Sequence, residues 1–228
     1  MIIKKIKGIM AVFCICAVFT VIAVRSTNNL SVQNTSAQKV QYILDAGHGI
    51  PDGGAVGADG TTEQELNLAI TKLVADELDQ KKISYILTRK DENSIYTEGE
   101  SIHAKKVSDV KHRIEIAAQN SSVPLISIHM NTFPSPSVHG IQVFYNEMNT
   151  DSKILGERLQ SAFNVELQPD NKKVSKTINK NVYLFSHIQN PSVLIECGFL
   201  SNDEELKKLK TGSYQQQLAR VIADVLCG

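Results

Sequence analysis

The stretch VQYILDAGHGIPDGG, residues 40–54, carries the strongest structural signal in this chain. It begins as a run of β-formers and then places His48 between two glycines, with three further glycines in the next eight residues. A phosphate-binding loop would explain the glycines but not the histidine. A metal site explains both, because a glycine-rich turn lets side chains and substrate approach an ion closely.

Short apolar runs and amphipathic helical patterns alternate along the rest of the chain. The apolar runs predict strands at residues 40–47, 83–89, 123–129, 140–146, 182–185 and 191–199. The helical patterns lie at residues 61–82, 107–120, 152–167, 202–211 and 213–228. Thr61 or Thr62 can cap the first helix, and Glu65 stands where a capping box places its acidic partner after Thr62.

This alternation predicts parallel strand pairing and an α/β fold. Residues 140–146 break the strict alternation and alternate in polarity, which is typical of a strand near a sheet edge. We therefore expect one three-layer α/β domain over residues 40–228. Its sheet should be mixed and mostly parallel, with about six strands flanked by helices, and an N-terminal apolar helix should precede it.

The N-terminal segment has the features of a targeting sequence. Residues 1–25 contain four bases and no acid, and residues 9–24 form an uncharged apolar run of 16 residues. That run is long for a signal-peptide core and slightly shorter than the roughly 17–25 residues of a membrane-spanning helix. We expect residues 1–25 to be a signal peptide or a membrane anchor, with the body exported. The polar, aperiodic residues 26–39 then form a linker.

Charge and cysteine usage exclude several classes of protein. The chain has a formal net charge of zero, so the residues after the +4 leader carry −4. A mildly acidic body does not match a nucleic-acid binder, which would show a basic stripe. The body holds two cysteines, Cys197 and Cys227, which can pair or remain separate thiols. Without a CxxC pair there, a metal site in the body must use histidine and carboxylate ligands.

Four polar residues are predicted to gather at one edge of the sheet. His48, His129 and Glu196 follow or end apolar strands, and Glu63 begins the first helix after the glycine-rich turn. In an open α/β sheet, functional groups collect at the carboxyl ends of the strands. Catalytic zinc takes three histidine or carboxylate ligands and leaves a position for water, and a separate carboxylate can carry the proton.

These residues also carry a resemblance to a known family. The runs ILDAGHGIPDGGAVGADGTTEQELNLAI, YILTR, RIEIAAQ, LISIHMN and PSVLIECGFLSN resemble the zinc-dependent N-acetylmuramoyl-L-alanine amidases of the type 3 family, in order and spacing over residues 40–228. The departures are mild: Ala46, Met130 and Cys197 replace residues more common in the family. In size and leader, the chain is most similar to the membrane-anchored sporulation amidases that act on spore-cortex peptidoglycan.

The resemblance implies a site and a reaction. The zinc ligands fall on His48, Glu63 and His129, with one Zn²⁺ per chain, and the catalytic glutamate falls on Glu196. Glu65 is the alternative to Glu63. Residues two apart on a helix point in different directions, so only one of the two is expected to reach the ion. The implied reaction hydrolyses the amide between N-acetylmuramic acid and L-alanine in peptidoglycan, the first step towards muramic δ-lactam in the cortex. Asn131, Gly53 and Gly54 are expected to contact the substrate.

The resemblance also bears on regulation. Some family members cover their site with a long inserted helix, but residues 147–153 are too few for one. We therefore expect control from outside the chain, such as an activating partner protein. The enzyme should act outside the cytoplasm, held near its substrate by residues 1–25 and the linker.

Other interpretations remain open at the level of sequence. A non-catalytic peptidoglycan-binding or scaffold protein could keep the same fold. A zinc carboxypeptidase would need an arginine clamp for a terminal carboxylate, and neither Arg89 nor Arg113 is obviously placed for that role. Arg113 is instead predicted to be a structural ion-pair partner. Asp45 either orients His48 or simply ends its strand.

Overall fold

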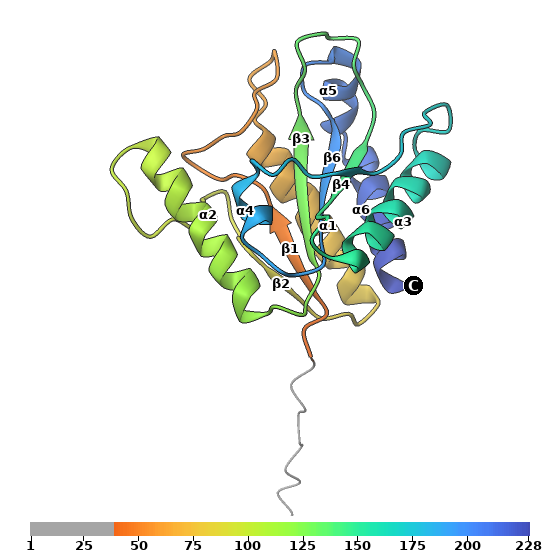
Figure 1. Cartoon of the computed structure of the whole chain (residues 1–228). Coiled ribbons are helices and arrows are strands. Elements are labelled where there is room, and N and C mark those ends of the chain that lie inside the picture. The colour runs from red at the N-terminus through yellow and green to blue at the C-terminus, as the bar shows by residue number, and fades with distance from the viewer. Residues whose placement is uncertain (1–38) are drawn as a thin grey trace, which may run out of the picture. The chain divides into compact units, whose positions relative to one another are not determined.

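A six-stranded sheet forms the centre of the structure, a computed structural model that describes residues 39–228 (Figure 1). Its strands are β1 (Tyr42–Ala46), β2 (Tyr85–Leu87), β3 (Leu125–Asn131), β4 (Gln142–Tyr145), β5 (Lys176–Thr177) and β6 (Ser192–Phe199). Their order across the sheet is β2-β1-β3-β6-β4-β5. The pairings are parallel except that of β4 with β6. The predicted mixed, mostly parallel α/β fold is confirmed.

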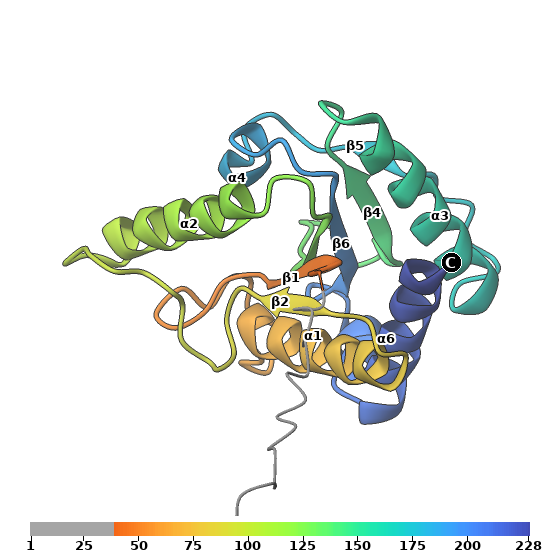
Figure 2. The same cartoon turned by 90° about the horizontal axis from the view of Figure 1, so that it is seen from below.

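The helices lie on both sides of this sheet (Figure 2). They are α1 (Glu63–Gln80), α2 (Ile102–Gln119), α3 (Thr150–Glu166), α4 (Tyr183–Ser186), α5 (Asp203–Leu209) and α6 (Gly212–Cys227). Helices α1 and α6 pack together under one face, and α2 and α4 contact each other over the opposite face. Helix α3 packs against β4 and α6. The result is the expected three-layer arrangement.

Strand alternation sorts the side chains of β6 between the two faces. Ile195 and Cys197 belong to the core beneath α1 and α6, whereas Leu194 belongs to the core on the α2 and α4 side. Because successive strand residues point to opposite faces, Glu196 points towards the α2 and α4 side. Cys197 is fully buried, which confirms its predicted place in the core, and both Cys197 and Cys227 are free thiols in the structure.

One local prediction needs correction. Residues 182–185 were expected to form a strand, but Tyr183–Ser186 form the short helix α4. The apolar run is too short for its periodicity to separate strand from helix. Its local bonding is helical, since the Ser186 amide donates to the Val182 carbonyl at 3.3 Å. The sixth strand is instead β5, two exposed residues without an apolar pattern to predict them.

The predicted leader at residues 1–25, and the linker up to residue 38, lie outside the described residues. The body, Lys39–Gly228, forms one compact unit. Within this unit, none of the helices combines the length and apolar character needed to cross a membrane.

Candidate metal centre and active site

His48 stands in the turn that follows β1. Its backbone has a left-handed φ of +61°, and the flanking Gly49 and Asp52 exchange backbone hydrogen bonds of 3.0 and 2.8 Å. This closed turn returns the Asp52 carboxylate to the histidine ring, where Oδ2 lies 2.8 Å from Nδ1. With Nδ1 occupied by Asp52, Nε2 is the ring nitrogen directed at Glu63, whose Oε2 is 3.3 Å away.

His129 approaches the same point from β3. Its ring centroid is 5.0 Å from that of His48, and the two ring planes are inclined by 73°. Nδ1 of His129 lies 2.8 Å from Oε1 of Glu63. The other side of the ring packs against Gly47, where an added Cβ would stand 2.2 Å from Nε2. His129 therefore presents Nδ1 to the cluster.

Glu63, the first residue of α1, joins the two histidines. Its side chain is buried, and its oxygens also accept the backbone N–H groups of Ala55 at 2.8 Å and Met130 at 3.1 Å. Gly54 allows the carboxylate this position, since a Cβ there would lie 2.5 Å from Oε2. One ligand atom each from His48, Glu63 and His129 lies within 4.8 Å of the others.

The choice between Glu63 and Glu65 is decided by the start of α1. Glu65 takes part in a capping box, in which its Oε2 accepts the Thr62 amide at 3.3 Å. It is exposed and directed at the helix end, away from the two imidazoles. Glu63 is thus the acidic residue that the structure brings to the histidines.

The pKa values of His48 and Glu63 are shifted by their mutual contacts. Burial lowers the pKa of His48, but hydrogen bonds to Asp52 and Glu63 outweigh this effect and raise it to about 9. Burial would raise the pKa of Glu63, yet hydrogen bonds with His129 and His48 hold it well below its usual range. The carboxylate is therefore ionised, and a cation is the species that it favours at this point.

The donor set fits zinc. Two imidazole nitrogens and one carboxylate are the ligands of many catalytic zinc sites, which leave a fourth position open. Ligand atoms around a tetrahedral zinc lie about 3.4 Å apart. Oε1 of Glu63 lies 2.8 Å from His129 Nδ1 and Oε2 lies 3.3 Å from His48 Nε2, and one ligand atom from each residue lies within 4.8 Å of the others. Gly47 and Gly54 keep the space around the donors clear of Cβ atoms.

Glu196 lies beside this cluster on the neighbouring strand. It is paired with His129 in the register of β3 and β6. Its Oε2 is shielded from solvent and finds no hydrogen-bond partner in the part of the chain that the structure describes. Burial raises the pKa of Glu196 to about 7. A carboxyl group that titrates near neutral pH can both accept and return a proton.

Asp45 does not orient His48, so that hypothesis is wrong. Its carboxylate accepts the hydroxyls of Thr88 at 2.7 Å and Ser127 at 2.6 Å, and it pairs with Arg113. Burial alone would raise the pKa of Asp45, but the Arg113 charge and these hydroxyls bring it to about 2. Asp45 faces a buried arginine because the strand's alternation directs its side chain beneath α2.

Two buried arginines support the backbone that carries His48. Arg113, paired with Asp45 and Asp109, donates to the carbonyl of His48 at 2.7 Å, which confirms it as a structural ion-pair partner. Arg89 donates to the carbonyl of Gly47 at 3.1 Å. Both guanidinium groups are at most 3% exposed. Neither is free to clamp a substrate carboxylate, as a carboxypeptidase would require.

The residues predicted to contact substrate lie around the same edge. Gly53 and Gly54 form the turn that leads into Glu63, and the Gly53 carbonyl accepts the Gln64 amide at 3.1 Å. Asn131 ends β3, where its side chain accepts the Thr132 amide at 2.8 Å. Their contact with substrate stays a prediction.

Asp52 and Lys106 were not predicted as site residues from the sequence. Asp52 holds His48 and is itself 3.0 Å from the ammonium of Lys106, which projects from α2. Both residues line a groove of about 390 Å³ that also reaches His48, His129 and Glu196. The glycine-rich turn has no periodic sequence pattern, so the contact between Asp52 and His48 could not be predicted from the sequence.

Comparison with known proteins agrees with this fold and site. The family model described as N-acetylmuramoyl-L-alanine amidase matches residues 43–227. The chain therefore belongs to the N-acetylmuramoyl-L-alanine amidase family.

Individual relatives cover most of the same region. The germination-specific N-acetylmuramoyl-L-alanine amidase of Bacillus subtilis is 31% identical over 185 residues, covering 81% of this chain and 76% of the relative. The CwlD amidase of Clostridioides difficile, solved in complex with the GerS lipoprotein, is 36% identical with a TM-score of 0.77, covering 81% of this chain and 94% of that chain. A second amidase structure, from Clostridium difficile 630, is 30% identical with a TM-score of 0.68, covering 82% and 94%.

Proposed function

We propose that this chain is a zinc-dependent N-acetylmuramoyl-L-alanine amidase that hydrolyses the amide between N-acetylmuramic acid and L-alanine in peptidoglycan. One observation carries the proposal. Donor atoms of His48, Glu63 and His129 converge within 4.8 Å. Glu196, whose Oε2 has no hydrogen-bond partner among residues 39–228, lines the groove that reaches the two histidines. Membership of the amidase family supports the choice of substrate.

The ligand roles follow from the atoms that face the centre. His48 would bind through Nε2, His129 through Nδ1, and Glu63 through its carboxylate. Bound zinc would polarise the scissile carbonyl and lower the pKa of a water molecule from 15.7 to about 7. Asp52 keeps Nδ1 of His48 in a hydrogen bond, so that the ring presents Nε2, and not Nδ1, to the metal position.

Glu196 is the group that moves the proton. Its pKa of about 7 suits a carboxylate that takes a proton from the attacking water and passes it to the nitrogen of the departing L-alanine. The C–N bond breaks, the carbonyl carbon gains the water oxygen, and the peptide leaves as a neutral or protonated amine. Water is the co-reactant, and no oxidant is needed.

The two rival functions fit the site less well. A non-catalytic wall-binding protein would have no use for a carboxyl oxygen, Glu196 Oε2, that is shielded from solvent and finds no hydrogen-bond partner among the described residues, because such an atom costs stability. A zinc carboxypeptidase would need a free arginine. Arg89 instead donates to a backbone carbonyl, and Arg113 donates to a backbone carbonyl and pairs with the buried Asp45.

We place this activity in spore-cortex maturation, outside the cytoplasm. The support comes from the relatives: a germination-specific amidase of Bacillus subtilis at 31% identity and the CwlD amidase at 36%. The basic, apolar residues 1–25 would serve as signal peptide or membrane anchor, residues 26–39 as linker, and residues 40–228 as catalytic domain. Removal of the stem peptide would be the first step towards muramic δ-lactam.

An activating partner protein is part of the proposal. The related CwlD amidase was solved with the GerS lipoprotein. In this chain only residues 146–149 separate β4 from α3, so the connection has no room for a covering helix. We therefore propose that regulation acts through a partner. Full turnover by the pure, zinc-loaded chain alone would refute the need for one.

Digestion of purified peptidoglycan tests the activity. Mass spectrometry should find free stem peptides that begin with L-alanine, together with muramic acid that lacks its peptide. The Glu196→Gln variant is the matched control and should release almost none. An unchanged digest with partner and zinc present would favour the scaffold function, and loss of only a C-terminal residue would favour a carboxypeptidase.

A further inference from the structure

The groove that reaches the candidate active site combines ionisable and apolar side chains. His48, His129 and Glu196 line it together with residues of α2 and α4. Apolar side chains make up much of its lining, from Val110, Val182, Leu184, Phe185 and Leu194. An extended substrate that reaches Glu196 can therefore continue along this groove.

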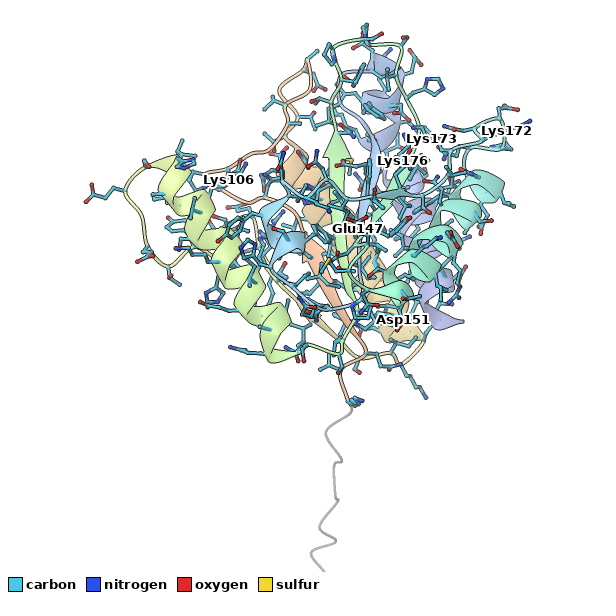
Figure 3. All side chains as sticks on the ribbon, viewed as in Figure 1. Lys106, Glu147, Asp151, Lys172, Lys173 and Lys176 are labelled. Carbon is cyan, nitrogen blue, oxygen red and sulfur yellow. The ribbon has the colours of Figure 1, made fainter. Side chains whose placement is uncertain are left out.

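Lys106 supplies an accessible positive charge to this groove. Its side chain is about half exposed, at 49%, and it lies on the groove-facing side of α2 together with Asp109 and Arg113. Arg113 also lines the groove, but it is buried and bound to acids and carbonyls. Figure 3 places Lys106 on α2, apart from the labelled lysines near β5 and α3 at the other end of the sheet.

The acids nearby leave this ammonium free to bind another anion. Asp45 and Asp109 are engaged with Arg113, and Asp109 also accepts the Ile95 amide at 2.7 Å. Asp52 shares its carboxylate between His48 and Lys106. An ammonium has three N–H donors, and the contact with Asp52 uses one of them. The Asp52 contact thus holds Lys106 at the groove while two donors remain.

We propose that the groove between α2 and α4 takes the peptide side of the substrate and that Lys106 pairs with a carboxylate of that peptide. This inference rests on the proposed amidase function. The two sides of the scissile amide differ in charge, because amino sugars present neutral hydroxyl and acetamido groups whereas the attached peptide carries free carboxylates. An exposed ammonium beside an apolar channel complements an acidic peptide.

The rival arrangement puts the sugar in this groove. Tyr183, half exposed on α4, also lines it, with its ring stacked on His187 at a centroid distance of 3.9 Å. A sugar recognised there would be bound by stacking, and removing a charge from the peptide would not matter. The charge dependence of cleavage therefore separates the two arrangements.

The test uses two soluble muramoyl peptides that differ in one group, the carboxylate nearest L-alanine, which is free in one and a carboxamide in the other. The wild-type chain, with zinc and any required partner, should cleave the acid with a kcat/KM about fivefold to tenfold higher. Lys106→Ala should remove this preference by slowing the acid alone, and Lys106→Arg should keep it. Lys111→Ala, an exposed lysine of α2 outside the groove, is the matched control and should leave the preference intact.

Each other outcome overturns the proposal. If the wild-type chain cleaves both substrates equally well, the groove does not recognise the carboxylate of the peptide, although the amidase function stands. If Lys106→Ala lowers kcat/KM equally for both substrates, the lysine acts only by holding Asp52. The zinc content of the variant should then also be lower than that of the wild type. Cleavage of neither substrate by the wild-type chain rejects the amidase function itself.

Discussion

The imidazole rings of His48 and His129 lie 5.0 Å apart, centroid to centroid, although they come from different strand ends. Parallel pairing of β1 with β3 puts Ala46 opposite Ile128, so the next residues of both strands emerge at the same edge. Glu63 then reaches both rings from the start of α1, at 3.3 and 2.8 Å. Strand register and a helix start are therefore what assemble the candidate metal centre.

Gly47→Ala should damage this centre without a comparable loss of folding. An added Cβ would stand 2.2 Å from two atoms of the His129 ring, so the ring must move away from Glu63. We expect zinc affinity to fall at least about tenfold, as when the supports of a metal ligand are removed. Competition with a chromophoric chelator measures the change.

Gly212→Ala is the control for that substitution. Gly212 begins α6, and a Cβ there meets no atom within 4 Å. This variant should bind zinc as the wild type does and melt within a few degrees of it. Equal zinc affinity in Gly47→Ala and the wild type would show that His129 is not a ligand, or that it binds in another orientation.

Asp52→Asn should weaken zinc binding through His48. The carboxylate holds Nδ1 of the ring at 2.8 Å and leaves Nε2 for the metal. Loss of such a support typically costs about 10-fold to 100-fold in metal affinity. Asp59→Asn is a suitable comparison, since Asp59 is an exposed acid of the same loop and pairs with Lys210 instead. Indistinguishable zinc dissociation constants for the two variants would contradict the role given to Asp52.

Glu196→Gln should separate catalysis from metal binding. The substitution removes the proton acceptor but keeps the side chain's size, and the carboxyl makes no hydrogen bond through Oε2 that folding would lose. Turnover should fall by about 10²-fold to 10⁴-fold. Zinc content and melting temperature should stay near wild-type values. A variant that retains more than a tenth of the activity would require another proton carrier.

The Asp45–Arg113 pair predicts an acid-sensitive contribution to stability. The pKa of Asp45 is about 2 in the folded chain against an ordinary value of 3.8. Because the folded value is the lower one, the stabilisation is complete above about pH 4 and is lost as the pH falls towards 2. The shift corresponds to about 2 kcal/mol.

Asp45→Asn tests that contribution. The substitution leaves Arg113 buried beside one acid fewer and should lower the free energy of unfolding by about 3 kcal/mol at pH 7. Urea denaturation from pH 7 to pH 2 should show a flatter decline for the variant than for the wild type. Parallel declines would mean that Asp45 does not titrate with folding.

Much of the site follows from the sequence because its parts are set by local patterns. Apolar runs locate β1, β3 and β6, and parallel pairing then aligns Ala46 with Ile128 and His129 with Glu196. These steps rest on the period of a strand and on strand pairing. The end of β3 was predicted too early, because β3 continues past His129 to Asn131, and Glu196 lies inside β6, which continues to Phe199. The choice of Glu63 over Glu65 came instead from the family resemblance, and the capping box of Thr62 and Glu65 in the structure agrees with it.

The errors lie where tertiary contacts decide. Asp45 pairs with an arginine from α2, a residue far along the chain whose placement no local pattern reveals. Asp52 reaches His48 through a turn of irregular backbone, including the positive φ of His48. Helix α4 is a four-residue element, too short for hydrophobic periodicity to distinguish it from a strand.

Metal analysis of the purified chain tests the central claim most directly. Inductively coupled plasma mass spectrometry should find one zinc per chain in the wild type and in Glu65→Ala, because Glu65 serves only the helix cap. Glu63→Ala, checked for folding by circular dichroism, should contain almost none. A wild type that binds no zinc, or a Glu63→Ala chain that keeps its zinc while Glu65→Ala loses it, would contradict the account.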